Sequence, residues 1–174
     1  MAPARKRTIQ HSTHPGHLLA EVYMNKEYIC DGCNTLGYGT RYRCDGCNFD
    51  LHEHCGTCPA RFSSFMHPRH QLNLIFSHID RICGVCGDRV EGRYYRCNLC
   101  NFDVHPLCTQ LPQFVRHAMH PGRPLRLQPS SPTWCMVCKN VCTSWRYSYN
   151  SPVLDDYALH PLQFALRPSL YKRH

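Results

Sequence analysis

Cysteine and histidine are the residues of this chain that could do chemistry, and their spacing is regular. The 174 residues include 14 cysteines and 13 histidines. Most of the cysteines form C-x2-C pairs, in which one tight turn can present two sulfur atoms to the same ion. In two places a second pair is followed by H-x2-C, which adds an imidazole and a further thiol. Four sulfur and nitrogen ligands in such sets are typical of tetrahedral zinc, so the pattern predicts a zinc protein.

The ligand pattern belongs to a repeat with a period of 53 residues. The phrase HPGHLLAEVY starts at His14, HPRHQLNLIF starts at His67, and HPGRPLRLQP starts at His120. The segment YRCDGCNFDLHEHC recurs in the same register as YRCNLCNFDVHPLC. Self-similarity at a fixed period indicates tandem structural units. We therefore expect one full module over residues 11–66, a second over 67–119, and an altered, degenerate third with the tail over 120–174.

A module of this size needs a stabiliser other than its apolar core. Such short units bury too little apolar surface to be comfortably stable, so disulfides or metal must contribute. The basic N-terminal segment has no apolar run after it, and no stretch approaches the ~20 apolar residues of a membrane span. We therefore expect no signal peptide, no transmembrane segment and an intracellular location, cytoplasmic or nuclear, where disulfides are rare. The histidines repeat along with the cysteines, which favours zinc, about four ions per chain.

The expected fold is a set of small, zinc-stabilised, β-rich (α+β) modules. HLLAEVY and HQLNLIF have the apolar alternation of strands, and TRYRC and RYYRC would be strands that lead into the second C-x2-C pair. FDLHEHC and FDVHPLC predict a short helix that places histidine and cysteine one turn apart. Phe49 and Phe102 are expected in the core.

The YRCxxCNFDxHxxC segments and the HPxH openings resemble the C1 domain, the zinc module of phorbol-ester and diacylglycerol type. The closer resemblance is to the divergent, CHP-rich C1 domains of plant proteins, and it covers about residues 11–121. It implies cross-braced zinc fingers with two sites in each module. In the first module, site A would be Cys30, Cys33, His52 and Cys55, and site B would use His17, Cys44 and Cys47. In the second module, site A would be Cys83, Cys86, His105 and Cys108, and site B would use His70, Cys97 and Cys100.

The fourth ligand of each site B is left open by the resemblance. C1 domains place a cysteine eight residues after the H-x2-C cysteine, and Ser63 and Arg116 stand at those positions here. For the first module, His67 is the favoured substitute and Cys58 is the alternative. For the second module, His117 and His120 are equally good substitutes.

The third module has lost the residues of one site. Arg123 replaces the histidine of site B, and YSYNSP replaces the second C-x2-C pair, so that site cannot form. Site A keeps half of its ligands: Cys135 and Cys138 preserve the first pair, and His160 aligns with His105. Cys142 or Asp156 could complete the set. We treat these residues as weaker candidates for a fifth ion.

A shell closed by four protein ligands leaves no position for water or substrate, so these zinc ions are expected to be structural. The sequence has no glycine-rich phosphate loop and no H-E-x-x-H motif. The leading hypothesis is a non-enzymatic zinc-binding module that binds an unidentified protein partner, in intracellular or stress signalling as the resemblance implies.

Three other classes of function are weaker alternatives. Lipid binding, to diacylglycerol or an acidic membrane, follows from the resemblance, but the segments 34–43 and 87–96 are short and rich in arginine for a neutral-lipid loop. Disulfide reductase-type redox chemistry is raised by the C-x2-C pairs. Nucleic-acid binding is not expected, because a net charge of +8, lowered to about +6 by two Cys3His zinc sites, is modest for phosphate binding.

Overall fold

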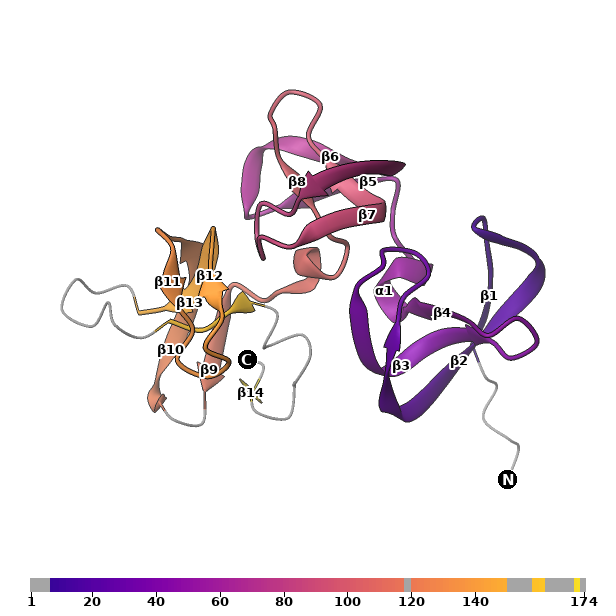
Figure 1. The fold of residues 1–174 in the computed structure, drawn as a ribbon, viewed down its shortest axis with the longest axis horizontal. Coiled ribbons are helices and arrows are strands. Elements are labelled where there is room, and N and C mark those ends of the chain that lie inside the picture. Colours follow the sequence, from indigo (N-terminus) through magenta and orange to yellow (C-terminus); the bar gives the residue numbers. More distant parts are fainter. Residues whose placement is uncertain (1–6, 118–119, 150–157, 162–170, 173–174) are drawn as a thin grey trace.

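The computed structural model describes residues 7–117, 120–149, 158–161 and 171–172, and these form three lobes along the chain (Figure 1). The first lobe consists of β1 (Thr8–His11), β2 (His14–Ile29), β3 (Leu36–Cys44), β4 (Phe49–His52) and α1 (Glu53–Gly56). The second consists of β5 (Arg61–Ser64), β6 (His67–Ile82), β7 (Arg89–Arg96), β8 (Asp103–Val104) and a 3-10 helix (Cys108–Gln110). The third contains β9 (Phe114–His117), β10 (His120–Pro129), β11 (Thr133–Trp134), β12 (Val141–Cys142), β13 (Trp145–Ser148) and β14 (Tyr171–Lys172).

The first two lobes have the same sheet. Four antiparallel strands are joined in the order β1-β2-β3-β4 and again in the order β5-β6-β7-β8. The long strands β2 and β6 each bury one leucine completely, Leu19 and Leu72, which are separated by one repeat. Each long strand also breaks register at a bulge, between Met24 and Glu27 in β2 and between Ser77 and Arg81 in β6. The predicted β-rich modules are confirmed for these two lobes.

Each repeat opening, HPxH in the first two lobes and HPGR in the third, pairs with a strand that precedes it in the chain. β1 pairs with β2, β5 with β6 and β9 with β10, all antiparallel. The boundaries expected at residues 67 and 120 therefore fall inside sheets, and pairing places the start of the second lobe at Arg61 or earlier. The preceding strands β1, β5 and β9 contain no cysteine, so the repeat of cysteine and histidine ligands did not predict that they belong to the modules that follow them.

The helix expected in each module is shorter than predicted. FDLH forms β4, and α1 covers only the four residues after His52. In the second lobe the helical turn is a 3-10 turn that begins at Cys108, so His105 precedes it. Pro106 and Leu107 lie between them.

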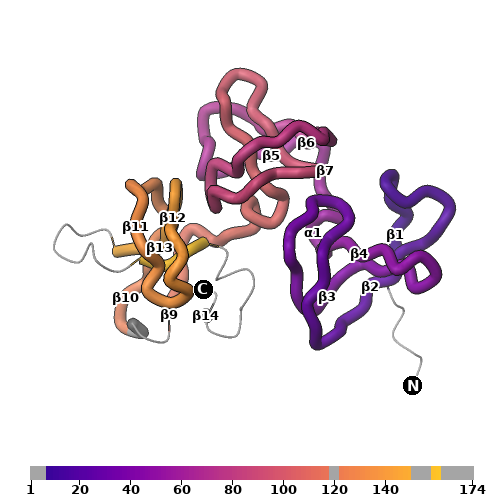
Figure 2. Tube along the Cα trace, viewed as in Figure 1, coloured from indigo at the N-terminus to yellow at the C-terminus, as the bar shows by residue number. Residues whose placement is uncertain are grey.

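The third lobe shares a core with the second. One apolar cluster runs from Leu72 and Tyr95 to Leu125 and Tyr147, whereas the first lobe has a cluster of its own. The third sheet has the order β13-β10-β9-β14, with a separate β11-β12 hairpin. Figure 2 shows the chain passing from α1 to β5 along one connecting stretch between the first two lobes.

Arg93 joins the first two lobes. Its backbone N–H donates to the Gly32 carbonyl at 2.8 Å, and its guanidinium contacts His11 Nε2 at 2.8 Å and Ser12 Oγ at 3.0 Å. Gly92 allows this approach, because a Cβ there would lie 2.7 Å from the Gly32 oxygen. The first two lobes are therefore in direct backbone contact.

Candidate metal centres

Four groups of cysteine and histidine bring their donor atoms within 4.8 Å of one another in the described residues. We name them A1 and B1 in the first lobe and A2 and B2 in the second. Group A1 is Cys30, Cys33, His52 and Cys55, and group A2 is Cys83, Cys86, His105 and Cys108. Group B1 is His14, His17, Cys44 and Cys47, and group B2 is His67, His70, Cys97 and Cys100. Each group therefore offers four sulfur or nitrogen donors and no carboxylate.

The separations within the A groups fit a tetrahedral zinc ion. Bonds of about 2.3 Å to sulfur and 2.0 Å to nitrogen imply roughly 3.8 Å between two sulfurs and 3.5 Å between sulfur and nitrogen. In A1, the Sγ atoms of Cys33 and Cys55 are 3.6 Å apart, and they lie 3.5 and 3.6 Å from His52 Nδ1. In A2, the sulfurs of Cys86 and Cys108 lie 3.4 and 3.8 Å from His105 Nδ1.

A tight turn presents the first cysteine pair of each A group. The N–H of Asn34 donates to the Cys30 carbonyl at 2.8 Å, and Gly87 donates to the Cys83 carbonyl at 2.9 Å. The turn ends in a residue with positive φ, 55° at Asn34 and 83° at Gly87, and asparagine and glycine adopt this conformation most easily. This local geometry directs both sulfurs of a C-x2-C pair to one point.

A backbone carbonyl fixes the ring of each A-group histidine. Nε2 of His52 donates to the carbonyl of Leu36 at 3.3 Å, and Nε2 of His105 donates to that of Arg89 at 2.8 Å. These carbonyls are also one repeat apart. A bond of this kind leaves Nδ1 free of its proton and aimed at the metal, as metal-binding histidines require.

The B groups are built from both histidines of the HPxH opening. Nδ1 of His17 lies 3.0 Å from Cys47 Sγ and 3.7 Å from Cys44 Sγ. In B2, His70 Nδ1 lies 3.3 Å from His67 Nε2 and 3.3 Å from Cys100 Sγ. Two neutral imidazoles and two thiolates form a common tetrahedral zinc set.

The first histidine of each opening is held against a phenylalanine. The rings of His14 and Phe49 stack with centroids 4.4 Å apart, and those of His67 and Phe102 with centroids 4.8 Å apart. Nε2 of His14 is buried and has no hydrogen-bond partner. An unpartnered buried nitrogen is costly, and a metal ion at B1 would satisfy it.

The fourth ligand expected for site B is therefore corrected. His67 was favoured for the first module, but it lies with His70 in B2, and His14 completes B1. Cys58 does not join B1, because its side chain contacts Cys55 instead. His117, which is buried, belongs to no converging group among the described residues, and the side chain of His120 lies outside them. The physical reason is the strand geometry: β2 carries both histidines of its own opening past β3, which ends at Cys44.

The third lobe contains a turn like that of an A group, without a converging set of four donors among the described residues. Lys139 donates to the Cys135 carbonyl at 3.0 Å and has a φ of 60°, which reproduces the turn of the other lobes. The N–H of His160 donates to Cys135 Sγ at 3.2 Å, as that of His52 does to Cys30 Sγ at 3.4 Å.

The ring of His160 lies against the second lobe. It contacts the backbone of Cys86 in the second lobe, and its pKa is lowered, chiefly by burial. Among the described residues, Cys135, Cys138, Cys142 and His160 form no group with converging donor atoms, and Asp156 lies outside those residues.

The electrostatics of A1 favour a cation at its centre. Hydrogen bonds from Cys33 and Cys55 hold the pKa of Cys30 far below its usual range, while the pKa of Cys55 is raised well above it by bonds with Cys30 and Cys33. Burial opposes charge on His52, yet its bonds with Cys30 and Cys33 raise its pKa to about 10. A1 thus combines a negatively charged Cys30 sulfur with protons that remain on Cys55 and His52, and a divalent ion would displace those protons. All fourteen cysteines are free thiols, as metal binding requires.

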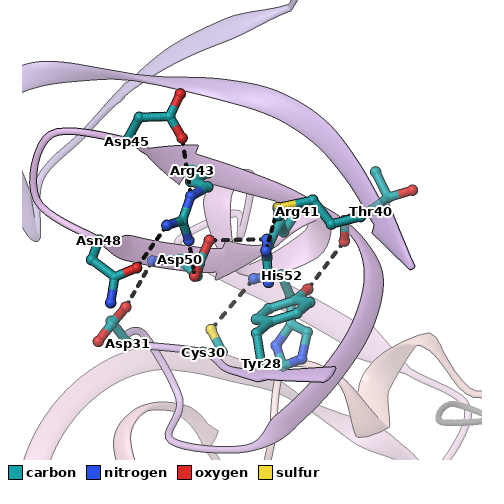
Figure 3. Close-up of polar contacts among 11 residues, drawn as sticks. Tyr28, Cys30, Asp31, Thr40, Arg41, Arg43, Asp45, Asn48, Asp50 and His52 are labelled. Carbon is teal, nitrogen blue, oxygen red and sulfur yellow. Dashed lines mark hydrogen bonds and ion pairs between the residues drawn. The ribbon is translucent and has the colours of Figure 1, made fainter. Parts of the chain in front are cut away.

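Asp50 forms ion pairs with two arginines and is hydrogen-bonded to the turn that carries Cys30 and Cys33 of A1 (Figure 3). One carboxylate oxygen lies 3.0 Å from Arg41 Nε in an ion pair, and the other accepts from Arg43 Nη1 at 2.6 Å. The backbone of Asp50 exchanges bonds with Asp31, which lies in the turn between Cys30 and Cys33. Arg41 and Arg43 of β3 are therefore engaged in ion pairs within the first lobe.

A comparison with models of protein families identifies the family to which the first two lobes correspond. The model of the C1 domain matches residues 12–56 and 65–109, together just over half of the chain, so the chain belongs to the C1 domain family. Searches of curated proteins and of solved structures returned no significant match. The predicted family and repeat are confirmed, and the four groups fit four zinc ions. C1 domains are regulatory modules rather than catalytic ones. No helix among the described residues has the length and apolar character that crossing a membrane requires.

Proposed function

We propose that this chain is a non-enzymatic, zinc-dependent protein-interaction module of intracellular signalling. The observation that carries the proposal is that each of the four groups offers four protein donor atoms within 4.8 Å of one another. A zinc ion in such a shell has no open position for a substrate, so its role is to stabilise the lobe. The ligand assignment of A1, A2, B1 and B2 is part of this proposal.

The surface offered to a partner lies on the long strands β2 and β6. Tyr23 and Phe76, one repeat apart, are 69% and 57% exposed, and Ile29 and Ile82, also one repeat apart, are 55% and 61% exposed. Large apolar side chains exposed at the same place in two modules favour contact with another molecule. Aromatic side chains are enriched at the centres of protein interfaces.

Lipid binding has less support in the residues between the cysteine pairs. The segments 34–43 and 87–96, where a lipid-admitting loop would lie, fall largely within β3 and β7, which pair with the long strands. Arg41 is completely buried, and Arg96 donates to Asp103 at 3.2 Å. These arginines form internal contacts, so they offer little positive charge to an acidic membrane.

The test uses the full zinc-loaded chain as bait, beside the double variant Y23A/F76A. L99A is the matched control, since Leu99 is 78% exposed but has Gly46 at the corresponding position of the first repeat. We expect a partner that binds the wild type and L99A and is lost with Y23A/F76A, while all three retain four zinc ions. Sedimentation with vesicles of phosphatidylcholine and diacylglycerol, in place of a protein partner, would overturn the proposal. So would catalytic turnover of a disulfide substrate.

A further inference from the structure

Cys58 is a thiol without a place in the metal groups. Every other cysteine of the first two lobes belongs to A1, A2, B1 or B2. Cys58 follows the last ligand of A1 in the segment Cys55-Gly56-Thr57-Cys58. Its spacing from Cys55 is therefore that of a C-x2-C pair, in which one member is a zinc ligand and the other is not.

The two thiols are close to each other. Cys55 and Cys58 lie close enough for each thiol to perturb the pKa of the other, and Cys58 also interacts electrostatically with His54 and with Tyr95 of the second lobe. α1 ends at Gly56, so Cys58 lies in the connecting stretch that leads to β5. It is partly exposed and lies between the exposed residues Thr57 and Pro59, whereas Cys55 is buried. A small oxidant in solvent can therefore reach Cys58 before it reaches Cys55.

We propose that Cys55 and Cys58 form a disulfide on exposure to a hydroperoxide, and that this oxidation releases the zinc ion of A1. The modification depends on the zinc assignment of A1 and is independent of any protein partner. Disulfide formation needs two sulfurs that can approach each other, and the C-x2-C spacing of Cys55 and Cys58, at the end of α1, is one at which thiol–disulfide couples form. A1 would then keep three donors, Cys30, Cys33 and His52, where tetrahedral structural zinc requires four.

The chemistry takes two steps. The Cys58 sulfur attacks one oxygen of hydrogen peroxide, the O–O bond breaks, and Cys58 becomes a sulfenic acid as one water leaves. The Cys55 thiolate then attacks the Cys58 sulfur, the S–S bond forms, and hydroxide leaves and takes up a proton as the second water. The two sulfurs lose two electrons and the peroxide gains them. A dithiol reductant with added zinc reverses the change.

The second lobe lacks this pair. One repeat after Cys58 the chain has Leu111, which is buried, so Cys108 has no neighbouring thiol at this spacing. The two lobes have the same kind of A group and differ at this point. The first lobe is therefore expected to respond to peroxide while A2 keeps its ion.

The test exposes the full zinc-loaded chain to increasing hydrogen peroxide. Zinc content is followed over time by native mass spectrometry without any chelator, and disulfides by non-reducing peptide mapping after rapid alkylation. We expect the first ion lost to accompany a Cys55–Cys58 disulfide. C58S should hold four ions before treatment and lose its first ion about tenfold more slowly, because no adjacent thiol captures the oxidant. L111C should gain a second peroxide-sensitive ion.

Three results would overturn the proposal. The first is a wild-type peptide map in which the earliest disulfide lacks either Cys55 or Cys58, a measurement that needs no variant. The second is equal rates of first-ion loss in C58S and the wild type. The third is C58S with three ions before any peroxide is added, which would make Cys58 a ligand. If peroxide removes only one ion from L111C, a thiol three residues after the ligand cysteine is not sufficient to make a zinc site sensitive to peroxide.

Discussion

Replacing Asp50 with asparagine should destabilise the first lobe, because Asp50 is the counter-charge of a buried arginine. The side chain of Arg41 is 1% exposed, and its ion pair with Asp50 spans 3.0 Å. Its other neighbours are the sulfur of Met24 and the ring of Tyr28, and neither carries charge. D50N keeps the shape of the side chain and removes the charge.

The magnitude follows from burial. Removing one partner of a buried ion pair leaves an uncompensated charge and costs about 3–5 kcal/mol. The second pair, Arg43 with Asp50, is less buried and adds about 1 kcal/mol at most. The second lobe has Tyr94, also buried, at the position of Arg41, so R41Y introduces a side chain that the repeat already accommodates. In an R41Y background, D50N should therefore cost only about 1 kcal/mol.

The assay is native-state hydrogen exchange of the zinc-loaded chain, which reports on each lobe separately. In D50N, the amides of β3 and β4 should exchange at least about a hundredfold faster, since 1.36 kcal/mol corresponds to a factor of ten. The amides of β7 and β8 in the second lobe serve as the internal control and should not change. Unaltered exchange in β3, or an equal cost of D50N with and without Arg41, would refute this reasoning.

Further predictions concern the metal groups. H14A and H67A should each reduce the zinc content measured by native mass spectrometry from four ions to three, whereas H117A should retain four; an H14A chain with four ions would contradict the composition of B1. A strong chelator should remove two ions quickly and two slowly, because the A groups are buried and B1 contains the exposed Cys47; a single phase for all four, followed with a chromophoric indicator, would argue against this difference. Since the pKa of His52 is raised to about 10 without metal, above its ordinary 6.5, its ring is protonated at pH 8, and zinc uptake there should release that proton. Calorimetric enthalpies that do not vary with the ionisation enthalpy of the buffer would contradict this expectation.

The repeat made the metal chemistry predictable from the sequence. A period of 53 residues brought the C-x2-C pairs and H-x2-C segments into register, and the resemblance to C1 domains implied the grouping that the structure shows as A1 and A2. The B groups were predicted incompletely, because the resemblance directed attention downstream of the H-x2-C cysteine. The signal for His14 was present, since HPGH and HPRH repeat both of their histidines.

Other features left little trace in the sequence. The carbonyls of Leu36 and Arg89 that orient His52 and His105 are backbone groups, which any residue provides. The strands that precede each HPxH opening pair through their backbones and share no ligand, so the repeat placed the boundaries too late. The buried position of Arg41 was also unexpected, because charge in a sequence indicates exposure unless a partner such as Asp50 can be located.

Zinc stoichiometry tests the central claim most directly. Native mass spectrometry of the reduced, folded chain should show four zinc ions, with the circular dichroism of the β-rich lobes lost when a chelator removes them. Two ions or fewer in a folded sample, or a spectrum that survives complete removal of zinc, would contradict the account.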